Sequence, residues 1–375
     1  MHLDEYTVLD LTQLLPGAYT TQLLADLGAT VLKVEPPDGD PLRSVPLVEP
    51  DDGVFDGLSR GKRSVTLDLK TDEGQEALHS IVTDVDVVIE GYRPGVASRL
   101  GADEETLRSI APNLVYCSLS GFGQSGPYSD RPGHDLTFAG LSGLVDLSRR
   151  STEQRPTPPP FSVSDIGGGL FAAFSIVTAL LSRERTGDGS YIDVSMLDVL
   201  LSFSQSYAPS ALAGTDPRPP EPFTGLYPCY DVYETADGRY VTLAAVEPQF
   251  WDRFCDLIDR PDLREKHCSP DPAVRDALRE EVVDIFAARS QSAWLEAADE
   301  ETPIAAVNTL EEALESDHAR ERELVVDGRI GFPAQTEPPV EPATDGPPAL
   351  GEHTREVLAA AGYSEAEIDA LVDAD

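Results

Sequence analysis

Strand and helix signals alternate along the first 120 residues, and this alternation limits the possible folds more than any other feature. Apolar runs with the spacing of strands are separated by segments with the spacing of helices, and Gly28 stops the first of these helices. The expected strands are 6–11, 30–34, 64–69, 86–90 and 114–119, and the expected helices are 20–27, 71–82 with Thr71 as its cap, and one beginning at 103–105. Such alternation predicts an α/β fold with a parallel sheet and helices on both faces.

Proline-rich stretches at 155–160, 216–222 and 336–349 divide the rest of the chain into connectors and compact segments. Between the last two, strand-like runs around Asp237-Gly238 predict a hairpin with a two-residue turn, and helices are expected at 247–258, 273–288 and 290–298. The predicted organisation is therefore a large domain whose first part spans 1–205, a linker at 206–227, a small domain at 228–330, and a tail at 331–375 whose helix 353–361 returns to the large domain.

The net charge limits the possible partners. The chain has 67 acidic and 28 basic residues, a net charge of -39, which argues against binding to nucleic acid or to an anionic membrane. So large a charge repels itself unless salt screens it, and an ordinary acidic protein would keep more than four lysines. We therefore expect a cytoplasmic protein of a salt-rich cell, although an acidic mesophilic protein is the alternative.

Targeting, membrane and metal signals are weak. The N-terminal residues have no basic region followed by an apolar run, and the longest apolar segment, 170–181, is shorter than a bilayer requires, so we expect a core helix there. The four cysteines show no CxxC spacing, and we expect neither a metal site nor a disulfide framework.

The stretch GFGQSGPYSDRPGHD at 121–135 contains a GxGxxG pattern after an expected strand. A dinucleotide-binding loop needs a helix to begin within the glycines, because the helix N-terminus binds the phosphates. Here Pro127, Pro132 and Gly133 continue the loop instead. The dinucleotide interpretation is therefore disfavoured, and His134 becomes the residue of interest.

Three side chains stand at the edges of regular elements and are candidates for chemistry. Asp165 comes at or just before a helix and is followed by three glycines; it is either a simple helix cap or part of a site that a ligand approaches closely. The N–H groups near Asp165 and Gly167 are candidate donors to a developing oxyanion. His134 is either solvated or functional, and Glu247 precedes Pro248 at an expected helix start.

Several long motifs resemble those of the CaiB/BaiF family, also called class III CoA-transferases, and within it the α-methylacyl-CoA racemases. They cover residues 6 to 330 in order: LLADLGATVLKVEPP, SRGKRSVTLDLKTDEG, EGYRPGV, SLSGFGQSGPYSDRPGHDLTF, SDIGGGLFAAFSIVTALLSRERTGDGSYIDVSMLD and ADGRYVTLAAVEPQFW. The resemblance implies a Rossmann-like large domain, a smaller α+β domain, and two chains interlocked in a homodimer. It places the active site between the large domain of one chain and the small domain of the other.

The resemblance also implies roles for the three candidates. His134, assisted by Glu247, is one acid/base and Asp165 is the other, and together they invert the carbon next to an acyl-CoA thioester through an enolate. Imidazole titrates near neutrality and burial raises the pKa of a carboxyl toward it, so the two groups suit proton transfer in both directions. No cofactor is expected beyond the CoA part of the substrate, and no metal.

Further positions match CoA-contacting residues of the racemases: Leu67, Leu69, Lys70, Arg93, Arg99, Asp135 and Phe138. Leu67 and Leu69 would flank the adenine, and Phe138 would lie near the thioester. The basic residues between 60 and 99, among them Arg60, Lys62 and Arg63, suit phosphate contacts. Pro36 and Pro37 replace a basic residue often found after the second strand, and Arg43 is a candidate substitute.

Two other functions remain open. A class III CoA-transferase would use Asp165 as a nucleophile that forms an acyl anhydride. Against it, VEPQF stands where the transferases carry a glycine-rich loop, and the histidine of GHD is present. A third possibility, an acidic dimeric scaffold without catalysis, requires His134, Asp165 and Glu247 to lie apart and exposed. The acyl group of the substrate is not indicated by any motif.

Overall fold

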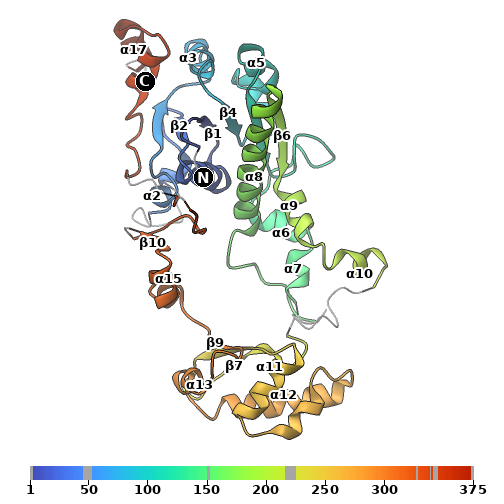
Figure 1. Ribbon diagram of the computed structural model, residues 1–375. Helices are drawn as coiled ribbons and strands as arrows, with labels where there is room; N and C mark the ends of the chain where they lie inside the picture. Colours follow the sequence, from blue (N-terminus) through green and yellow to red (C-terminus); the bar gives the residue numbers. More distant parts are fainter. Residues whose placement is uncertain are drawn as a thin grey trace. The chain divides into compact units, whose positions relative to one another are not determined.

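The computed structural model describes residues 3–44, 53–149, 153–215, 225–326, 328–337, 339–340 and 345–372, so the proline stretch 216–222 and parts of 336–349 lie outside the described residues. Contacts divide the chain into two compact units (Figure 1). The first unit comprises residues 1–145, 158–203 and 318–375, and the second comprises 146–157 and 204–317. The sequence-based boundaries place the small domain at 228–330. The second unit instead begins at 204, ends at 317 and also includes 146–157.

The first unit contains a six-stranded parallel sheet of order β3-β2-β1-β4-β5-β6; the alternation of elements predicted a parallel sheet and five of these strands, but not β6. Its strands are β1 (Thr7–Leu11), β2 (Thr30–Glu35), β3 (Arg63–Thr66), β4 (Val87–Glu90), β5 (Val115–Ser120) and β6 (Ser190–Ser195). Its helices are α1 (Leu14–Asp26), α2 (Val54–Gly57), α3 (Asp72–Val82), α4 (Val96–Arg99), α5 (Glu104–Ile110), α6 (Asp135–Leu141), α8 (Val163–Thr186), α9 (Met196–Phe203), α16 (Thr354–Ala360), α17 (Glu365–Val372) and the 3-10 helix η1 (Pro41–Ser44). A short antiparallel pair joins β10 (Val325–Val326) and β11 (Arg329–Ile330).

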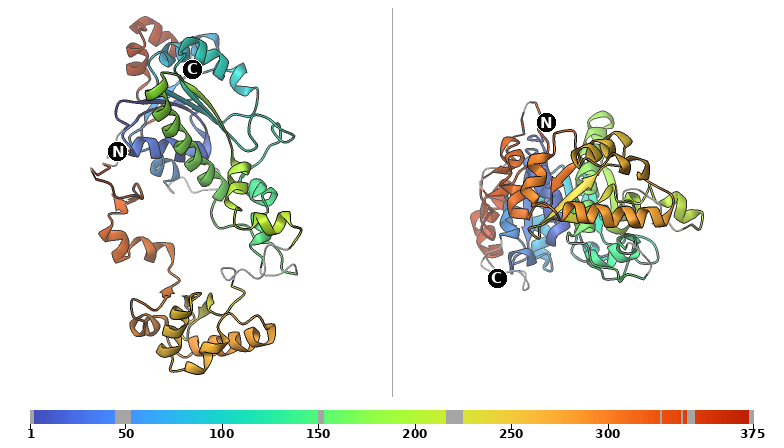
Figure 2. Two further views of the ribbon diagram at one scale, coloured as in Figure 1. Left: turned by 45° about the vertical axis from the view of Figure 1, so that its right-hand side comes forward. Right: turned by 90° about the horizontal axis from the view of Figure 1, so that it is seen from below.

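Alternate residues of each strand face opposite sides of the sheet, and each side has its own core. Val8 and Val31 pack with α1 and α8 on one face, whereas Leu9 and Leu32 pack with α3, α5, α16 and α17 on the other. Figure 2 shows α8 lying along the sheet. Because both faces are covered, β1, β2, β4 and β5 are buried at nearly every position, whereas the edge strand β6 alternates over its first four residues.

Local capping explains where several helices start. The Thr71 side chain accepts a hydrogen bond from the N–H of Gly74, and the Asp103 side chain accepts one from Thr106. The C-terminal helix α16 lies beside β3, where the N–H of His353 donates to the carbonyl oxygen of Ser64 at 2.9 Å. The tail thus packs against the first unit.

Helix α8 has 24 residues and extends beyond the apolar segment seen in the sequence. By length and composition it is apolar enough to cross a membrane, with a mean hydropathy of 1.6 over its most apolar window. Half of that window is buried inside the protein, and the core helices of soluble proteins meet the same criterion.

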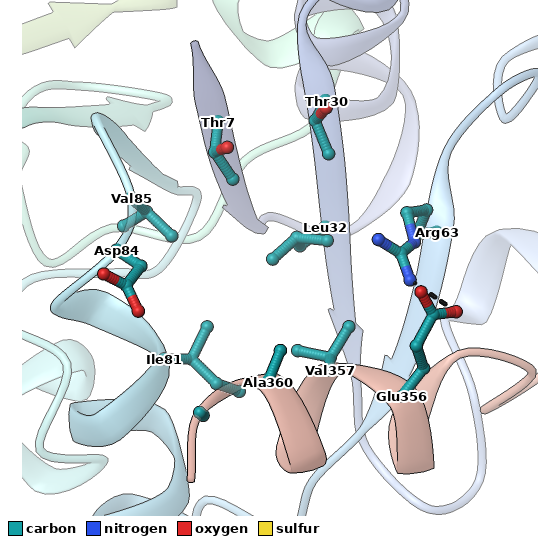
Figure 3. Close-up of a pocket in the computed structure, with 11 residues that line it drawn as sticks. Thr7, Thr30, Leu32, Arg63, Ile81, Asp84, Val85, Glu356, Val357 and Ala360 are labelled. Carbon is teal, nitrogen blue, oxygen red and sulfur yellow. Dashed lines mark ion pairs between the residues drawn. The ribbon is translucent and has the colours of Figure 1, made fainter. Parts of the chain in front are cut away.

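A cavity of about 190 Å³ lies between α16 and the amino ends of β1, β2 and β3 (Figure 3). Leu32, Ile81 and Val357 line it, and the ion pair between Arg63 and Glu356 borders it. Open α/β sheets bind their ligands at the carboxyl ends of the strands, the opposite edge. We therefore interpret this cavity as incomplete packing beneath α16.

The second unit is built on an antiparallel sheet of order β7-β8-β9. Its elements are β7 (Tyr230–Glu234), β8 (Tyr240–Ala244), β9 (Ile304–Ala306), α10 (Ala208–Leu212), α11 (Pro248–Leu257), the 3-10 helix η3 (Pro261–Lys266), α12 (Pro272–Phe286), α13 (Gln291–Ala297) and α14 (Leu310–Leu314). The short helices α7 (Leu144–Leu147) and α15 (Asp317–Glu321) lie where the chain passes between units. Trp251, Phe254, Phe286 and Trp294 form its core.

The predicted hairpin is present, but its loop is longer than predicted. The N–H of Thr235 donates to the carbonyl oxygen of Arg239, which leaves three residues between the paired positions. Gly238 has a φ of +73°, the left-handed conformation that closes three-residue hairpin loops. The Asp237-Gly238 signal therefore located the turn correctly and gave the wrong loop length.

Candidate active site

The strand order reverses between β1 and β4, and such a reversal creates a crevice at the carboxyl edge of the sheet. Leu14 follows β1 there with a φ of +64° and is 38% exposed. A leucine in this conformation is rare and strained, and such residues gather at functional sites. Sequence analysis missed Leu14, because no residue pattern predicts a left-handed leucine.

The loop from 121 to 134 follows β5 and contains no helix start within its glycines. Gly133 packs against Phe138, and a Cβ at Gly133 would lie 2.6 Å from the Phe138 ring. Phe138 is 2% exposed and contacts Phe122 edge to face. In this chain, the glycines therefore let the loop wrap around Phe138, and the ring supports the loop instead of lying open to a ligand.

His134 is the N-cap residue of α6 and is exposed. Its N–H donates to Thr137 Oγ1 at 3.4 Å, and its carbonyl oxygen accepts from the N–H of Thr137 at 2.7 Å. These contacts fix the backbone of His134. The side chain is thereby presented at a helix start beside Asp135.

Asp135 joins the start of α6 to the start of α8. Its Oδ1 accepts hydrogen bonds from the N–H of Ser164 at 2.7 Å, from Ser164 Oγ at 2.5 Å and from the N–H of Asp165 at 3.4 Å. A carboxylate at a helix N-terminus also complements the helix dipole. Asp135 therefore caps α8 from another helix and brings His134 and Asp165 into the same small region.

Asp165 is the third residue of α8 and is half-buried. Burial, and next the negative charge of Asp135, raise the pKa of Asp165 to about 6, while the charge of His134 opposes this rise. Because His134 acts on Asp165 electrostatically, the structure brings these two candidates together. The Asp165 carboxyl can thus gain and lose a proton near neutral pH.

The expected oxyanion site near Asp165 and Gly167 is wrong for this chain, because its N–H donors are already used. Val163 donates to the carbonyl oxygen of Phe161, Ile166 donates to that of Ser162, and Asp135 accepts from the two residues between them. Gly167 lies beyond the first turn, where N–H groups bond within the helix. No first-turn N–H of α8 is therefore left for an enolate oxygen.

The three glycines of α8 allow close packing rather than ligand approach. A Cβ at Gly169 would lie 2.7 Å from the carbonyl oxygen of Pro16, and one at Gly168 would lie 2.6 Å from Met196. Gly167 faces Phe203 in the same way. The triplet therefore lets α8 approach α1 and α9 closely.

Several basic residues expected to contact phosphates are buried instead. Arg60 is 6% exposed and pairs with Asp26, and Lys62 is 3% exposed and donates to Thr21 Oγ1 at 2.7 Å. Lys62 also lies 3.8 Å from Asp10, and burial lowers its pKa to about 8. Both side chains are engaged with partners inside the fold, so a direct phosphate contact by Arg60 or Lys62 is wrong for this conformation.

Arg43 and Arg63 also have acidic partners. Arg43 binds Glu35 at 2.7 Å through two nitrogens and donates to the carbonyl oxygen of Pro348. Arg63 pairs with Glu356 at 2.8 Å. Arg60, Lys62 and Arg63, three of the six basic residues grouped between 60 and 99, are therefore neutralised within the fold.

Lys70, Arg93 and Arg99 are exposed, and within the described ranges no ion pair involves them. Gln75 connects two of their segments, because its Nε2 donates to the carbonyl oxygens of Leu69 at 2.9 Å and Arg99 at 3.4 Å. These three cations are thus free to meet anions in solution.

Leu67 and Leu69 are 4% and 7% exposed, and their side chains belong to the core beneath α3. Contact with an adenine would have to come from their main chain.

Glu247 is the cap residue of α11 in the second unit and is exposed. His134 and Asp165 belong to the first unit. The assistance of His134 by Glu247 stays a prediction of the resemblance.

Comparison with known proteins identifies the family. The profile of CoA-transferase family III matches residues 3–354. A succinyl-CoA:mesaconate CoA-transferase of Haloarcula hispanica is 35% identical, covering 96% of both chains, and an α-methylacyl-CoA racemase of Mus musculus is 35% identical, covering 98% of this chain and 97% of that one. The crystal structure of a CAIB/BAIF family protein from Brucella suis superposes with a TM-score of 0.85 at 30% identity, covering 96% of this chain and 99% of that chain. With the sheet order and the matched motifs, these similarities show that the chain belongs to CoA-transferase family III.

Proposed function

We propose that the protein inverts the configuration of the 2-methyl-bearing carbon of an acyl-CoA, with His134 and Asp165 as the two acid/base groups. The observation that carries this proposal is their common position at the starts of α6 and α8, where Asp165 has a pKa of about 6. Racemisation requires one group to remove the proton and another to return it on the opposite face. A carboxyl with a pKa of about 6 beside an imidazole meets this requirement in both directions.

The two proton transfers need only the side chains of Asp165 and His134 and no cofactor. The carboxylate of Asp165 takes the C2 proton, the electrons of the C–H bond move toward the thioester oxygen, and protonated His134 delivers a proton to the other face. The opposite direction exchanges the two roles. The enolate oxygen needs a donor from outside the first turn of α8, since those N–H groups are bonded to protein acceptors.

The CoA part of the substrate would bind through Lys70, Arg93 and Arg99. Their exposure and lack of acidic partners in the described part of the chain leave them available for phosphate groups. In this acidic protein, with a net charge of -39, such a local group of cations is needed to attract a polyanion.

The second candidate is CoA transfer between an acyl-CoA and a free carboxylic acid. The similarity to relatives named as CoA-transferases favours it as strongly as the similarity to the racemases favours inversion. Here the Asp165 carboxylate would attack the thioester carbonyl, form an acyl anhydride and release CoA as a thiolate. The thiolate would then form a thioester with Asp165, and the acyl group would leave as the free acid.

The deciding experiment incubates the protein with one enantiomer of a 2-methylacyl-CoA in heavy water, with and without a free dicarboxylic acid such as mesaconate. Deuterium entering C2 together with loss of optical purity supports racemisation. Appearance of the dicarboxylic acid's CoA thioester without deuterium at C2 supports transfer and overturns the proposal. Asp165→Asn abolishes either reaction, whereas His134→Gln slows only the exchange of the C2 proton by at least about 100-fold.

We also propose that the protein is a homodimer in the cytoplasm of a salt-rich cell. Large apolar side chains on and near α8 are exposed in the single chain, among them Leu170, Phe174 and Leu181 at 50%, 65% and 56%. An apolar face of this kind favours a protein partner. The charge of -39 supports the high-salt setting, because salt reduces the repulsion among carboxylates.

A further inference from the structure

Two cysteines and a histidine converge at the open end of the β7–β8 hairpin in the second unit. Cys229 precedes β7, and His267 and Cys268 follow η3. The Sγ atoms of Cys229 and Cys268 are 3.5 Å apart, and Cys268 Sγ is 3.4 Å from His267 Nε2. All three donor atoms lie within 4.8 Å of one another. Sequence analysis expected no metal ligands, because 39 residues separate the cysteines and no CxxC motif marks them.

The fold builds this cluster from rigid parts. Cys229 is 1% exposed, and its carbonyl oxygen accepts from the N–H of Ala245 at 2.7 Å, just after β8. The His267 ring stacks on Trp251 at 5.7 Å between centroids. Cys268 has a φ of +46°, a strained conformation for a residue with a side chain. The backbone therefore holds all three donors in place without needing a ligand to order them.

The distances match those between ligands of one metal ion. A tetrahedral ion with metal–sulfur bonds of about 2.3 Å separates two sulfur ligands by about 3.8 Å, and a sulfur and a nitrogen by slightly less. The observed separations of 3.5 and 3.4 Å need only small adjustments. A disulfide would require the two sulfurs to approach to about 2.05 Å, a much larger movement.

We propose that Cys229, His267 and Cys268 form a binding site for a thiophilic divalent cation of the Zn²⁺ class. Two thiolates and one imidazole are ligands that select such ions over Mg²⁺ or Ca²⁺. Binding replaces the thiol protons, which are released to solvent, and no oxidation occurs. His267 Nε2 donates to the carbonyl oxygen of Ala245 at 3.0 Å, because a carbonyl oxygen only accepts, so ion binding must move this proton to Nδ1 and replace the hydrogen bond with a metal–nitrogen bond. Water is the expected fourth ligand.

The cation would tie η3 to the open end of the hairpin. Ala245 lies two residues before Glu247, so the bound ion would stiffen the segment that carries the candidate carboxylate. The site itself lies within the second unit and uses no residue of the proposed reaction. Its test therefore needs no substrate, and its failure leaves the proposed function untouched.

The experiment titrates the reduced, full-length protein with Co²⁺ and then displaces Co²⁺ with Zn²⁺, without acyl-CoA. We expect one equivalent of Co²⁺ to produce sulfur-to-cobalt charge-transfer absorption, and Zn²⁺ to abolish it. Cys229→Ser and His267→Gln should each weaken Zn²⁺ binding by at least about 100-fold, more than the loss of an outer-sphere contact usually does. Cys255→Ala is the matched control, since Cys255 is a buried cysteine of the same unit outside the cluster.

Tryptophan fluorescence checks that each variant is folded, because both tryptophans lie in the core of the second unit. For the wild-type protein, Zn²⁺ should also raise the midpoint of unfolding, followed by the same tryptophan fluorescence. This measurement requires no variant. Absence of stoichiometric Co²⁺ or Zn²⁺ uptake by the reduced protein overturns the proposal. Equal uptake by Cys229→Ser overturns it as well, as does a Cys229–Cys268 disulfide that forms in air despite equimolar Zn²⁺.

Discussion

Replacement of Asp165 by asparagine is expected to stabilise the folded chain at neutral pH while abolishing activity. Burial and the neighbouring Asp135 raise the pKa of Asp165 from 3.8 to about 6, so the folded protein disfavours the charged carboxylate. The difference corresponds to about 3 kcal/mol at about 1.36 kcal/mol per unit. Because Asp165 is only half-buried, solvent screening reduces this to about 1–2 kcal/mol. The asparagine side chain carries no charge and escapes this penalty.

The pH dependence has a definite sign. Below pH 3.8 the carboxyl is neutral in the folded and the unfolded chain, so Asp165 imposes no penalty. As pH rises from 3.8 to about 6, the unfolded chain ionises first, and the folded wild type loses stability relative to Asp165→Asn. Above pH 6 the difference between the two proteins is constant.

The assay is urea unfolding followed by far-UV circular dichroism between pH 4 and pH 8, at one fixed salt concentration. Tryptophan fluorescence follows the second unit in the same samples, since Trp251 and Trp294 both lie there. Asp130→Asn is the control, because Asp130 is a carboxylate on the loop before His134 and is not part of the site. A stability difference for Asp165→Asn that stays constant from pH 4 to pH 8, or that favours the wild type as pH rises, refutes the reasoning.

Three further expectations follow from the same structure. Gly169→Ala should destabilise the first unit by about 1–2 kcal/mol in urea unfolding, because overpacking against Pro16 outweighs the gain in helix propensity. Gly140→Ala is the control: it has open space around it and should stabilise by up to about 1 kcal/mol. Phe174→Glu should convert the proposed dimer to monomer in light scattering, and an unchanged mass would exclude this face from the interface. Raising salt from about 0.1 M to about 1 M should raise the unfolding midpoint of the wild type, and a flat response would argue against the salt-rich setting.

The alternation of elements in the sequence predicted a parallel sheet and five of its six strands, which begin and end within a few residues of the predicted positions, whereas the edge strand β6 was not predicted. The helix ends were predicted less well. Residues 14–19 belong to α1, although Pro16 and Gly17 are more typical of loops. Pro16 lies in the first turn, where no N–H partner is required, and Gly17 packs tightly against Thr12. Only the folded arrangement shows that these residues favour the helix there.

The candidate site was predicted through its residues but not through its interactions. Sequence analysis selected His134 and Asp165, and the structure brings them together, yet nothing local indicates that Asp135 occupies the N–H groups of α8. The burial of Lys62 and Arg60 was missed for the same reason. Their partners Thr21 and Asp26 lie 41 and 34 residues away, and charge counted along the sequence cannot show such pairing.

Asp135 links stability to chemistry at this site. Its carboxylate stabilises the start of α8 by accepting three hydrogen bonds, and the same negative charge destabilises ionised Asp165. Substitution of Asp135 by asparagine keeps an oxygen acceptor for Ser164 but removes the charge. The pKa of Asp165 should then fall toward 3.8, as measured by carboxyl-carbon NMR, while the helix start is retained. A pKa that stays at about 6 after this substitution would mean that burial alone sets the proton affinity of Asp165, and that Asp135 acts only as a cap.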